Sequence, residues 1–205
     1  MSKQEITLYE KSIQSRTRIN YIKGLIVRYR NYIRYSKTAR IARKKGAIIG
    51  EGVILTPDLR KVLNQNFKIG NHCSLHSVKF SSNLHNVTIG NNVIIGSGAK
   101  IIRGSHDIDS PEFENKVTNP NLIIEDYVWI CPDSVILPSV KKIGYGAVIG
   151  ANSVVVKDVE PMSVVSGNPA KEVRKRECVH ENLVVESLLG GDYIIYKRTW
   201  KNRKK

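Results

Sequence analysis

The sequence has few cysteines and no long hydrophobic run. Cys73, Cys131 and Cys178 are isolated, odd in number and without CxxC spacing. This argues against a disulfide framework and indicates reduced thiols, as in a cytosolic protein. No stretch approaches the ~18 apolar residues that a membrane-spanning helix needs, and the N-terminus shows neither an apolar core nor a cleavage-like site. We therefore expect a cytoplasmic protein that is neither secreted nor membrane-spanning.

Acidic residues are also scarce: 18 Asp and Glu stand against 33 Lys and Arg, a net charge of +15. The excess sits at the two ends, because residues 1–45 carry thirteen basic and two acidic residues, whereas residues 46–170 are nearly neutral. Basic ends of this kind suit an anionic surface such as a membrane or a phosphate. No helix-turn-helix, zinc-finger or RNA-recognition pattern accompanies the charge, so we do not expect nucleic acid as the partner. His72, His76, His85 and His180 do not cluster with Cys or acids, and no metal site is expected.

What the chain does contain is an aliphatic residue at every sixth position between Val87 and Ala170. The repeat has three runs: Ile89, Ile95 and Ile101; Ile124, Ile130 and Ile136; Ile143, Ile149 and Val155. Gly, Asn and small polar residues follow these aliphatics. A period of six fits neither an amphipathic helix nor a hairpin, and it predicts a parallel β-helix with short strands and tight corners. The predicted fold class is mainly β, with the β-helix at residues 46–171.

The repeat is interrupted from Arg103 to Asn121. This segment is polar, contains Pro111 and Pro120, and shows no six-residue period. Nearly twenty irregular residues inside a solenoid must be extruded from the coil, and loops of this length are uncommon unless they are functional or disordered. We expect residues 103–121 to form such an extruded loop.

The basic N-terminal segment, residues 1–45, is expected to form one or two helices. An apolar stripe runs along it at spacings of three and four: Ile19, Ile22, Ile26, Tyr29 and Ile33. One interpretation is an interfacial helix on anionic lipid. The other, which we favour, is that the stripe packs on the β-helix while the charge faces water.

The C-terminal extension, residues 172–205, is expected to cap the last coil. Glu172 to Leu189 suggests a helix stopped by Gly190-Gly191, and Asp192 to Trp200 alternates like a final strand.

Three stretches resemble the hexapeptide-repeat acyltransferases, and most closely the bacterial sugar O-acetyltransferases of the colanic-acid and maltose/galactoside type. They are Gly104-Ser105-His106-Asp107 with Pro111 and Phe113; Val128-Trp129-Ile130 with Ile136-Leu137-Pro138; and Ile143-Gly144 through Gly167-Asn168-Pro169-Ala170-Lys171. The resemblance implies a left-handed β-helix, a homotrimer, and acetyl-CoA bound between neighbouring prisms as co-substrate. The extruded loop would reach the neighbouring subunit.

His106 matches the catalytic histidine of that family. A neutral imidazole can take the proton of an attacking hydroxyl, and a backbone N–H can stabilise the oxyanion. No GxSxG nucleophile motif is present, so a direct transfer is expected. Asp107 and Asp109 either orient the imidazole or bind the acceptor, or they are solvated loop acids.

The same resemblance assigns cofactor contacts to five residues: Trp129, Ala151, Lys157, Lys171 and Arg174. Trp129 would stack on pantetheine or form a wall of the acetyl site, although a strand aromatic packed outside the coil is the alternative. Ala151 would meet pantetheine through its backbone, and the three cations would pair with phosphates. The sequence departs from the family at Cys131-Pro132, where proline removes an N–H donor, and at Val156, where threonine is common.

The acceptor-binding residues of the galactoside and maltose enzymes do not match the stretch from His76 to Leu84, which argues against those simple sugars. We expect an acetyl-CoA-dependent O-acetyltransferase acting on a sugar or glycan in surface-polysaccharide synthesis. The alternatives are an N-acetyltransferase of an amino-sugar nucleotide, an antibiotic acetyltransferase, and a non-catalytic β-helix scaffold. The basic N-terminal segment leaves peripheral contact with the inner face of the membrane open.

Overall fold

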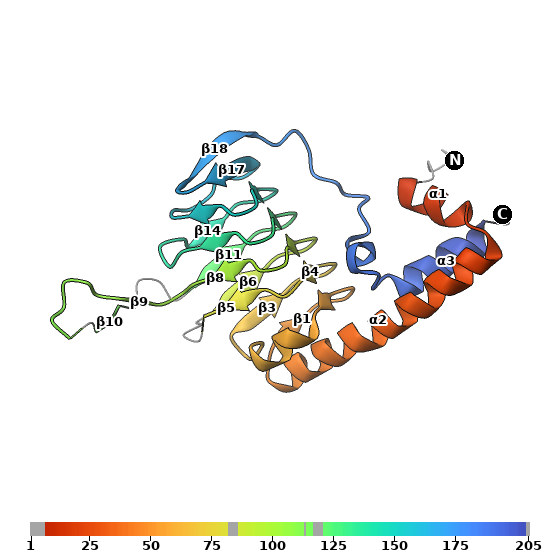
Figure 1. Ribbon diagram of the computed structural model, residues 1–205, viewed down its shortest axis with the longest axis horizontal. Helices are drawn as coiled ribbons and strands as arrows, with labels where there is room; N and C mark the ends of the chain where they lie inside the picture. Colours follow the sequence, from red (N-terminus) through yellow and green to blue (C-terminus); the bar gives the residue numbers. More distant parts are fainter. Residues whose placement is uncertain (1–6, 82–85, 113, 117–120, 204–205) are drawn as a thin grey trace.

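The computed structural model describes residues 7–81, 86–112, 114–116 and 121–203. Its body is a parallel β-helix of short strands stacked into three sheets, with helices at one end (Figure 1). The fold class expected from the sequence is confirmed. The first sheet contains, in spatial order, β1 (Ile48–Ile49), β3 (Phe67–Ile69), β6 (Val87–Ile89), β11 (Leu122–Ile124) and β14 (Lys142–Ile143).

The other two sheets close the prism. The second contains β2 (Ile54–Leu55), β4 (Ser74–Leu75), β7 (Ile94–Ile95), β12 (Trp129–Ile130), β15 (Val148–Ile149), β17 (Ser163–Gly167) and β18 (Ala170–Lys175). The third contains β5 (Lys79–Phe80), β8 (Lys100–Ile101), β13 (Val135–Ile136) and β16 (Val154–Val155). All pairs within these sheets are parallel except β17–β18.

The six-residue repeat fills the interior of the prism. All nine aliphatics of the three runs are buried, with no more than 2% of any residue exposed. The register stacks them on one another, as where Ile130 lies beside Ile95 on one side and Ile149 on the other. Small buried residues such as Ala99 and Ala147 lie between them along the chain. Stacking of like aliphatics makes one continuous core, in which every coil depends on its neighbours.

The corners of the coil use left-handed backbone at the third residue after the inward aliphatic. Gly98 (φ 75°) and Asn152 (φ 54°) hold this position, as the sequence leads one to expect. His72 (φ 54°) and Tyr127 (φ 60°) hold it as well, although larger side chains disfavour this conformation. These two corners are therefore held by their surroundings as well as by local preference.

Two helices precede the β-helix, as expected for residues 1–45: α1 (Leu8–Gln14) and α2 (Arg18–Lys44). Thr7 and Glu10 form a capping box at the start of α1, and Thr17 caps α2. The buried residues of α2 near its C-terminal end include Tyr35, Ala39 and Ala42, and they pack against β1, β2 and the 3₁₀ helix η1 (Pro57–Lys61). Helix α2 thus covers the first coil.

The favoured expectation for the apolar stripe of α2 is wrong. Its members do not pack on the β-helix, because each exposes half or more of its surface: Ile19, Ile22, Ile26, Tyr29 and Ile33. Ala39 and Ala42 make the contact instead, since their small side chains let the helix backbone approach the first coil closely.

The C-terminal extension differs from expectation in three ways. Residues 170–175 form strand β18, which pairs with the open edge of β17, so the expected helix from Glu172 is wrong. Residues 193–202 form helix α3 (Tyr193–Asn202), so the expected strand is wrong. The chain between them returns along the prism to the first coils, where the 3₁₀ helix η2 (Val185–Leu189) contacts β4 and α3 packs on α1 and α2 (Figure 1). The last coil is covered by β18 rather than by a helix.

A buried polar junction joins the three α-helices. The Tyr9 hydroxyl donates to Asp192 Oδ2 across 2.5 Å, and Arg28 Nε lies 2.9 Å from Asp192 Oδ1. The Asp192 side chain is fully buried. Burial and the hydrogen bond to Asp192 raise the pKa of the Tyr9 hydroxyl. The junction ties α1, α2 and the start of α3 together.

Gly24 has a packing role in the same place. A Cβ at Gly24 would lie 2.5 Å from the Tyr196 hydroxyl oxygen, and Tyr196 is completely buried between the helices. Its ring stacks on that of Tyr21, and the Arg28 guanidinium lies 4.1 Å from its centroid. Glycine here allows α3 to approach α2. Among the described residues, no helix combines the length and the apolar character needed to cross a membrane.

Candidate functional site

The interruption of the repeat forms a hairpin that leaves the prism. Strand β9 (Ser105–His106) pairs antiparallel with β10 (Asn115–Lys116), with His106 opposite Asn115. The Asp107 N–H donates to the Glu114 carbonyl across 2.8 Å. Figure 1 shows the hairpin reaching away from the stacked coils, on the side opposite the returning C-terminal segment. His106 is exposed on this hairpin.

The root of the hairpin is held by a buried arginine. Arg103 exposes only 1% of its surface, and its Nη1 and Nη2 donate to the carbonyls of Val140 (2.7 Å) and Asn121 (3.1 Å). Its backbone N–H donates to Ser81 Oγ across 2.9 Å. Burial lowers the pKa of Arg103, while the nearby charge of Asp158 opposes this shift. Sequence reasoning did not identify Arg103 as a buried residue. Its position two residues after the inward-facing Ile101 was the available signal that its side chain is buried.

Asp107 shapes the loop next to His106. Its Oδ1 accepts the N–H of Asp109 across 3.2 Å, and its carbonyl accepts the N–H of Ser110 across 3.3 Å. This is an Asx-type turn, in which a short carboxylate folds the backbone. Asp109 is exposed.

Trp129 lies on the opposite side of the chain from the hairpin. It projects from β12, 44% exposed, into a cavity of about 170 Å³ that it shares with Tyr127 and with side chains of the returning C-terminal segment. Arg176 fixes that segment, because its Nη1 donates to the carbonyls of Tyr127 and Gly146, both at 3.0 Å. The structure thus gives Trp129 an aromatic and aliphatic environment within its own chain.

The cationic candidates lie at the last coil. Lys157 and Lys171 line a hollow of about 400 Å³ beside the β17–β18 hairpin, together with Asp158 and Glu160. Arg174 is exposed on β18 and donates to the carbonyl of Lys175 across 3.0 Å. Ala151 is exposed after β15. Lys157 and Lys171 are thus brought together, whereas neither shares a cavity with Trp129 or His106 among the described residues.

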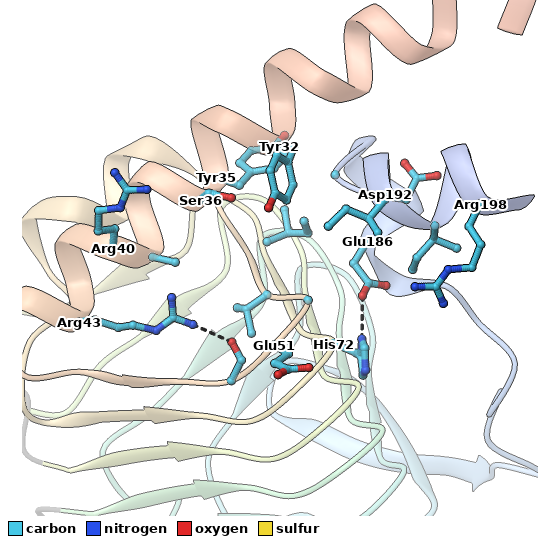
Figure 2. A pocket seen from close by; sticks show the side chains of 18 of the residues that line it. Tyr32, Tyr35, Ser36, Arg40, Arg43, Glu51, His72, Glu186, Asp192 and Arg198 are labelled. Atoms are coloured by element: carbon cyan, nitrogen blue, oxygen red, sulfur yellow. Dashed lines mark hydrogen bonds and ion pairs between the residues drawn. The ribbon is translucent and has the colours of Figure 1, made fainter.

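A larger cavity lies elsewhere, between α2, the first coils and the C-terminal elements (Figure 2). Its volume is about 990 Å³. Inside it, His72 Nδ1 lies 2.7 Å from Glu186 Oε1, and the Glu186 side chain is 7% exposed against 50% for His72. Sequence reasoning found no clustering of His72 with acids and placed Glu186 in a helix, so it missed this pair. A histidine at a corner where Gly or Asn is usual was the available signal. In the described part of the chain, no group of three His, Cys, Asp or Glu side chains could hold a metal ion.

Comparison with known proteins gives the following relatives. No family model matches the chain. A chloramphenicol acetyltransferase of Klebsiella aerogenes is 32% identical over 149 residues, which cover 57% of this chain and 70% of the relative. A candidate colanic acid biosynthesis acetyltransferase of Escherichia coli is 28% identical over 155 residues, 76% of this chain and 84% of the relative.

Among solved structures, the fold is similar to that of a hexapeptide-repeat acetyltransferase from Vibrio cholerae, complexed with acetyl coenzyme A. The TM-score is 0.62 at 24% identity, over 84% of this chain and 91% of that one. At this identity the likeness concerns the fold.

Proposed function

The chain belongs to the hexapeptide-repeat acetyltransferases, and within that family we propose that it transfers an acetyl group from acetyl-CoA to a hydroxyl of a sugar or glycan in bacterial surface-polysaccharide synthesis. The observation that carries this proposal is the hairpin that interrupts the regular core and presents His106. A rigid prism with one polar hairpin is a suitable scaffold for a positioned base. The relative named for colanic acid biosynthesis supports the polysaccharide assignment.

The proposed chemistry is a single displacement. His106 takes the proton of the acceptor hydroxyl while the oxygen attacks the thioester carbonyl. A backbone N–H stabilises the negative charge that develops on the carbonyl oxygen. As the tetrahedral intermediate collapses, the C–S bond breaks and the protonated imidazole returns its proton to the thiolate. The products are the O-acetyl ester and CoA, and His106 is neutral again.

The separation of the candidate residues supports a site between subunits. The β9–β10 hairpin, which carries His106, projects from one side of the chain (Figure 1), whereas Trp129 shares a cavity with the C-terminal segment and Lys157 and Lys171 line a hollow at the last coil. We infer a homotrimer in which the His106 hairpin of one subunit reaches the donor-binding surface of the next. Trp129 and Ala151 then contact pantetheine, and Lys157, Lys171 and Arg174 pair with the phosphates of CoA. Because acetyl-CoA is the donor, the reaction belongs in the cytoplasm.

A second candidate is an antibiotic hydroxyl, because a relative at 32% identity is named for chloramphenicol. An amino-sugar nucleotide is a third, since the same fold and donor would serve an amine. Both differ from the main proposal in the acceptor and not in the donor.

The test is CoA-thiol release from acetyl-CoA with a panel of acceptors: surface-polysaccharide repeat units, UDP- and dTDP-linked amino sugars, and chloramphenicol. Mass spectrometry of the products separates esters from amides. We expect ester formation on a glycan. Turnover of the amino sugars or of chloramphenicol alone would replace the glycan assignment, and absence of CoA binding by calorimetry would favour a scaffold.

A further inference from the structure

Helix α2 has one face that packs against the first coil and an opposite face that is exposed. Its buried residues, among them Tyr35, Ala39 and Ala42, turn toward the first coil. At 3.6 residues per turn, the row made by Ile19, Ile22, Ile26, Tyr29 and Ile33 lies on the opposite side of the helix, and each of its members is exposed by 50% or more. We call this row the outward stripe. Isoleucines that repeat along one outward face form a contiguous apolar patch, and such patches mark interaction sites.

The charge around the outward stripe has one sign. Helix α2 contains nine Lys and Arg and no acidic residue. Lys37, Arg40 and Lys44 continue the line of the stripe toward the C-terminal end of the helix. In the described part of the chain, Arg28 is the one basic side chain of α2 that pairs with a carboxylate. The outward face therefore combines aliphatic side chains with uncompensated positive charge.

The large cavity adjoins this face. Arg40 and Lys44 belong both to its lining and to the line of the stripe. Arg198 lines the cavity from α3, on the opposite side of the view in Figure 2 from Arg40. No hydrogen bond or ion pair of these three side chains is found among the described residues, whereas Arg43 donates to the carbonyls of Ile49 and Gly50.

The interior of the cavity is suited to a partly apolar ligand. Val53, Ile54 and Ile195 contribute to its walls. Its two buried acids are already paired, Glu186 with His72 and Asp192 with Arg28, and the third lining acid, Glu51, is exposed. The cavity therefore offers unpaired cations near apolar walls, an arrangement that suits an anionic headgroup with its adjoining chain.

Charge decides between the possible occupants of this face. A second copy of the chain would present the same cationic helix and be repelled. Nucleic acid would account for the cations but not for the exposed isoleucines, since phosphate contacts need no aliphatic stripe. A bilayer with anionic lipids satisfies both, because aliphatic side chains enter the acyl boundary, tyrosines lie at the headgroups and cations pair with phosphates.

We propose that α2 is a membrane-docking helix that places its outward stripe in an anionic bilayer, with lipid phosphates held at the rim of the cavity by Arg40 and Lys44 on one side and by Arg198 on the other. This is independent of acetyl transfer, because binding to lipid requires neither His106 nor a donor.

The test is flotation of the full-length protein with vesicles of phosphatidylglycerol and phosphatidylcholine, and with vesicles of phosphatidylcholine alone. We expect binding to the anionic vesicles only, falling as salt rises. The double variant Ile22→Asp/Ile26→Asp should weaken partitioning at least ~tenfold, because it removes two inserted side chains and adds two negative charges. Ile48→Asp, a matched change at an isoleucine that is 60% exposed on β1, should leave binding intact.

A second set of variants tests the cavity. Replacing Arg40, Lys44 and Arg198 by Gln should weaken binding to anionic vesicles while leaving the stripe in place. Free glycerol phosphate should not displace the vesicles, since it lacks the acyl chain. Displacement by glycerol phosphate, or unchanged binding of the triple variant, would remove the cavity from the proposal.

Three results would overturn the docking itself. The first is equal binding by wild type and Ile22→Asp/Ile26→Asp, or no vesicle binding at all. The second is a change of oligomeric state in the double variant, measured by light scattering, which would identify the stripe as a subunit interface. The third is tight binding of duplex DNA that displaces vesicles and is retained by the double variant.

Discussion

The guanidinium of Arg103 donates a hydrogen bond to the carbonyl oxygen of Asn121 across 3.1 Å, so the first residue of the extruded segment holds the last. The same side chain donates to the carbonyl of Val140 in the neighbouring coil. The geometry of the hairpin base, and with it the direction in which His106 projects, therefore depends on one buried side chain.

Arg103→Met should lower both stability and turnover. The buried carbonyl of Val140 and the more exposed carbonyl of Asn121 lose their donor, which costs roughly 1–3 kcal/mol in the free energy of unfolding. A displaced hairpin should reduce kcat at least ~tenfold while the KM for acetyl-CoA changes little, because misplacing a catalytic group costs rate. Denaturant unfolding and steady-state kinetics measure the two effects.

Arg60→Met is the matched control for Arg103→Met. Arg60 donates to Thr38 Oγ1 and to the carbonyl of Arg34, far from the hairpin. The Arg60→Met variant should have a lower free energy of unfolding than wild type and an unchanged kcat. An Arg103→Met enzyme with wild-type kcat would contradict the positioning role.

His106→Ala should reduce kcat by roughly 10²–10⁴-fold, which is the usual contribution of a general base. CoA affinity measured by calorimetry should not change, since His106 lies on the hairpin and not beside Lys157 and Lys171 at the last coil. Glu112→Ala, an exposed change on the same hairpin, should keep its activity. Equal turnover in wild type and His106→Ala would refute the mechanism.

Gly24→Ala should destabilise the protein although alanine is the better helix former. Helix propensity alone predicts a gain of about 1 kcal/mol. The new Cβ would lie 2.5 Å from the hydroxyl oxygen of buried Tyr196, and overpacking of this kind costs about 1–3 kcal/mol. A net fall in the melting temperature is expected. The cost should shrink in a Tyr196→Phe background, and a net gain in either background would show that α3 moves away freely.

Stability should depend on pH through Glu125. Its Oε1 lies 2.6 Å from Lys142 Nζ, and its Oε2 accepts the Tyr145 N–H across 2.7 Å. The hydrogen bond from Lys142 lowers the pKa of the Glu125 carboxyl, and the Tyr145 N–H adds to this effect. A carboxyl whose pKa is lower in the folded than in the unfolded chain stabilises the fold fully at pH values above its unfolded pKa. That stabilisation is lost as the pH falls through the folded pKa.

Glu125→Gln should therefore cost about 0.5 kcal/mol at neutral pH, the size expected of a partly exposed pair. The difference from wild type should vanish in acid. Urea unfolding across the pH range measures it. Glu160→Gln, an exposed carboxylate without an ion pair among the described residues, should show no such pH-dependent loss. A cost for Glu125→Gln that persists in acid would contradict the ion-pair explanation.

The three cysteines should react with a thiol reagent in a fixed order. Cys178 is exposed, Cys131 is half-buried with its pKa raised by burial, and Cys73 is buried with its pKa raised to about 12. At pH 8 the thiolate fraction of a group with a pKa of 12 is about 10⁻⁴, and the thiolate is the reactive form. Mass spectrometry should find Cys178 modified first and Cys73 protected until denaturant is added. Early modification of Cys73 would mean that the first coils open.

The β-helix was predictable because its six-residue period has one physical solution. The nine aliphatics of the repeat, from Ile89 to Val155, must all face the axis of the β-helix, and all nine are buried. The position of His106 on an extruded segment followed from the same pattern, since a break in the period has to leave the coil. These inferences needed no knowledge of tertiary contacts.

The sequence-based predictions were wrong where tertiary packing determines which face of a helix is buried or which secondary structure forms. The spacing of Ile22 and Ile26 correctly predicted a helix, but it did not identify the face of the helix that is buried. Ala39 and Ala42, on the opposite face, permit a closer contact with the first coil. Residues from Lys171 pair with β17 because that edge was open. Tyr193 to Trp200 fits a period of two or of 3.6, and the contact of Tyr196 with Tyr21 and Arg28 selects the helix. The proposed site between subunits came from the family resemblance and not from the repeat itself, and within one chain the candidate residues Trp129 and Lys157 line different cavities.

The two ends of the β-helix are closed by different means, helix α2 over the first coil and β18 antiparallel to β17. A stack of parallel strands with open ends is a template on which further strands can add without limit. Here one terminal edge is occupied by a strand whose side chains are mostly exposed, including Lys171, Glu172 and Lys175. This strand occupies one of the three sheet edges at that end, and further strands cannot add to that edge.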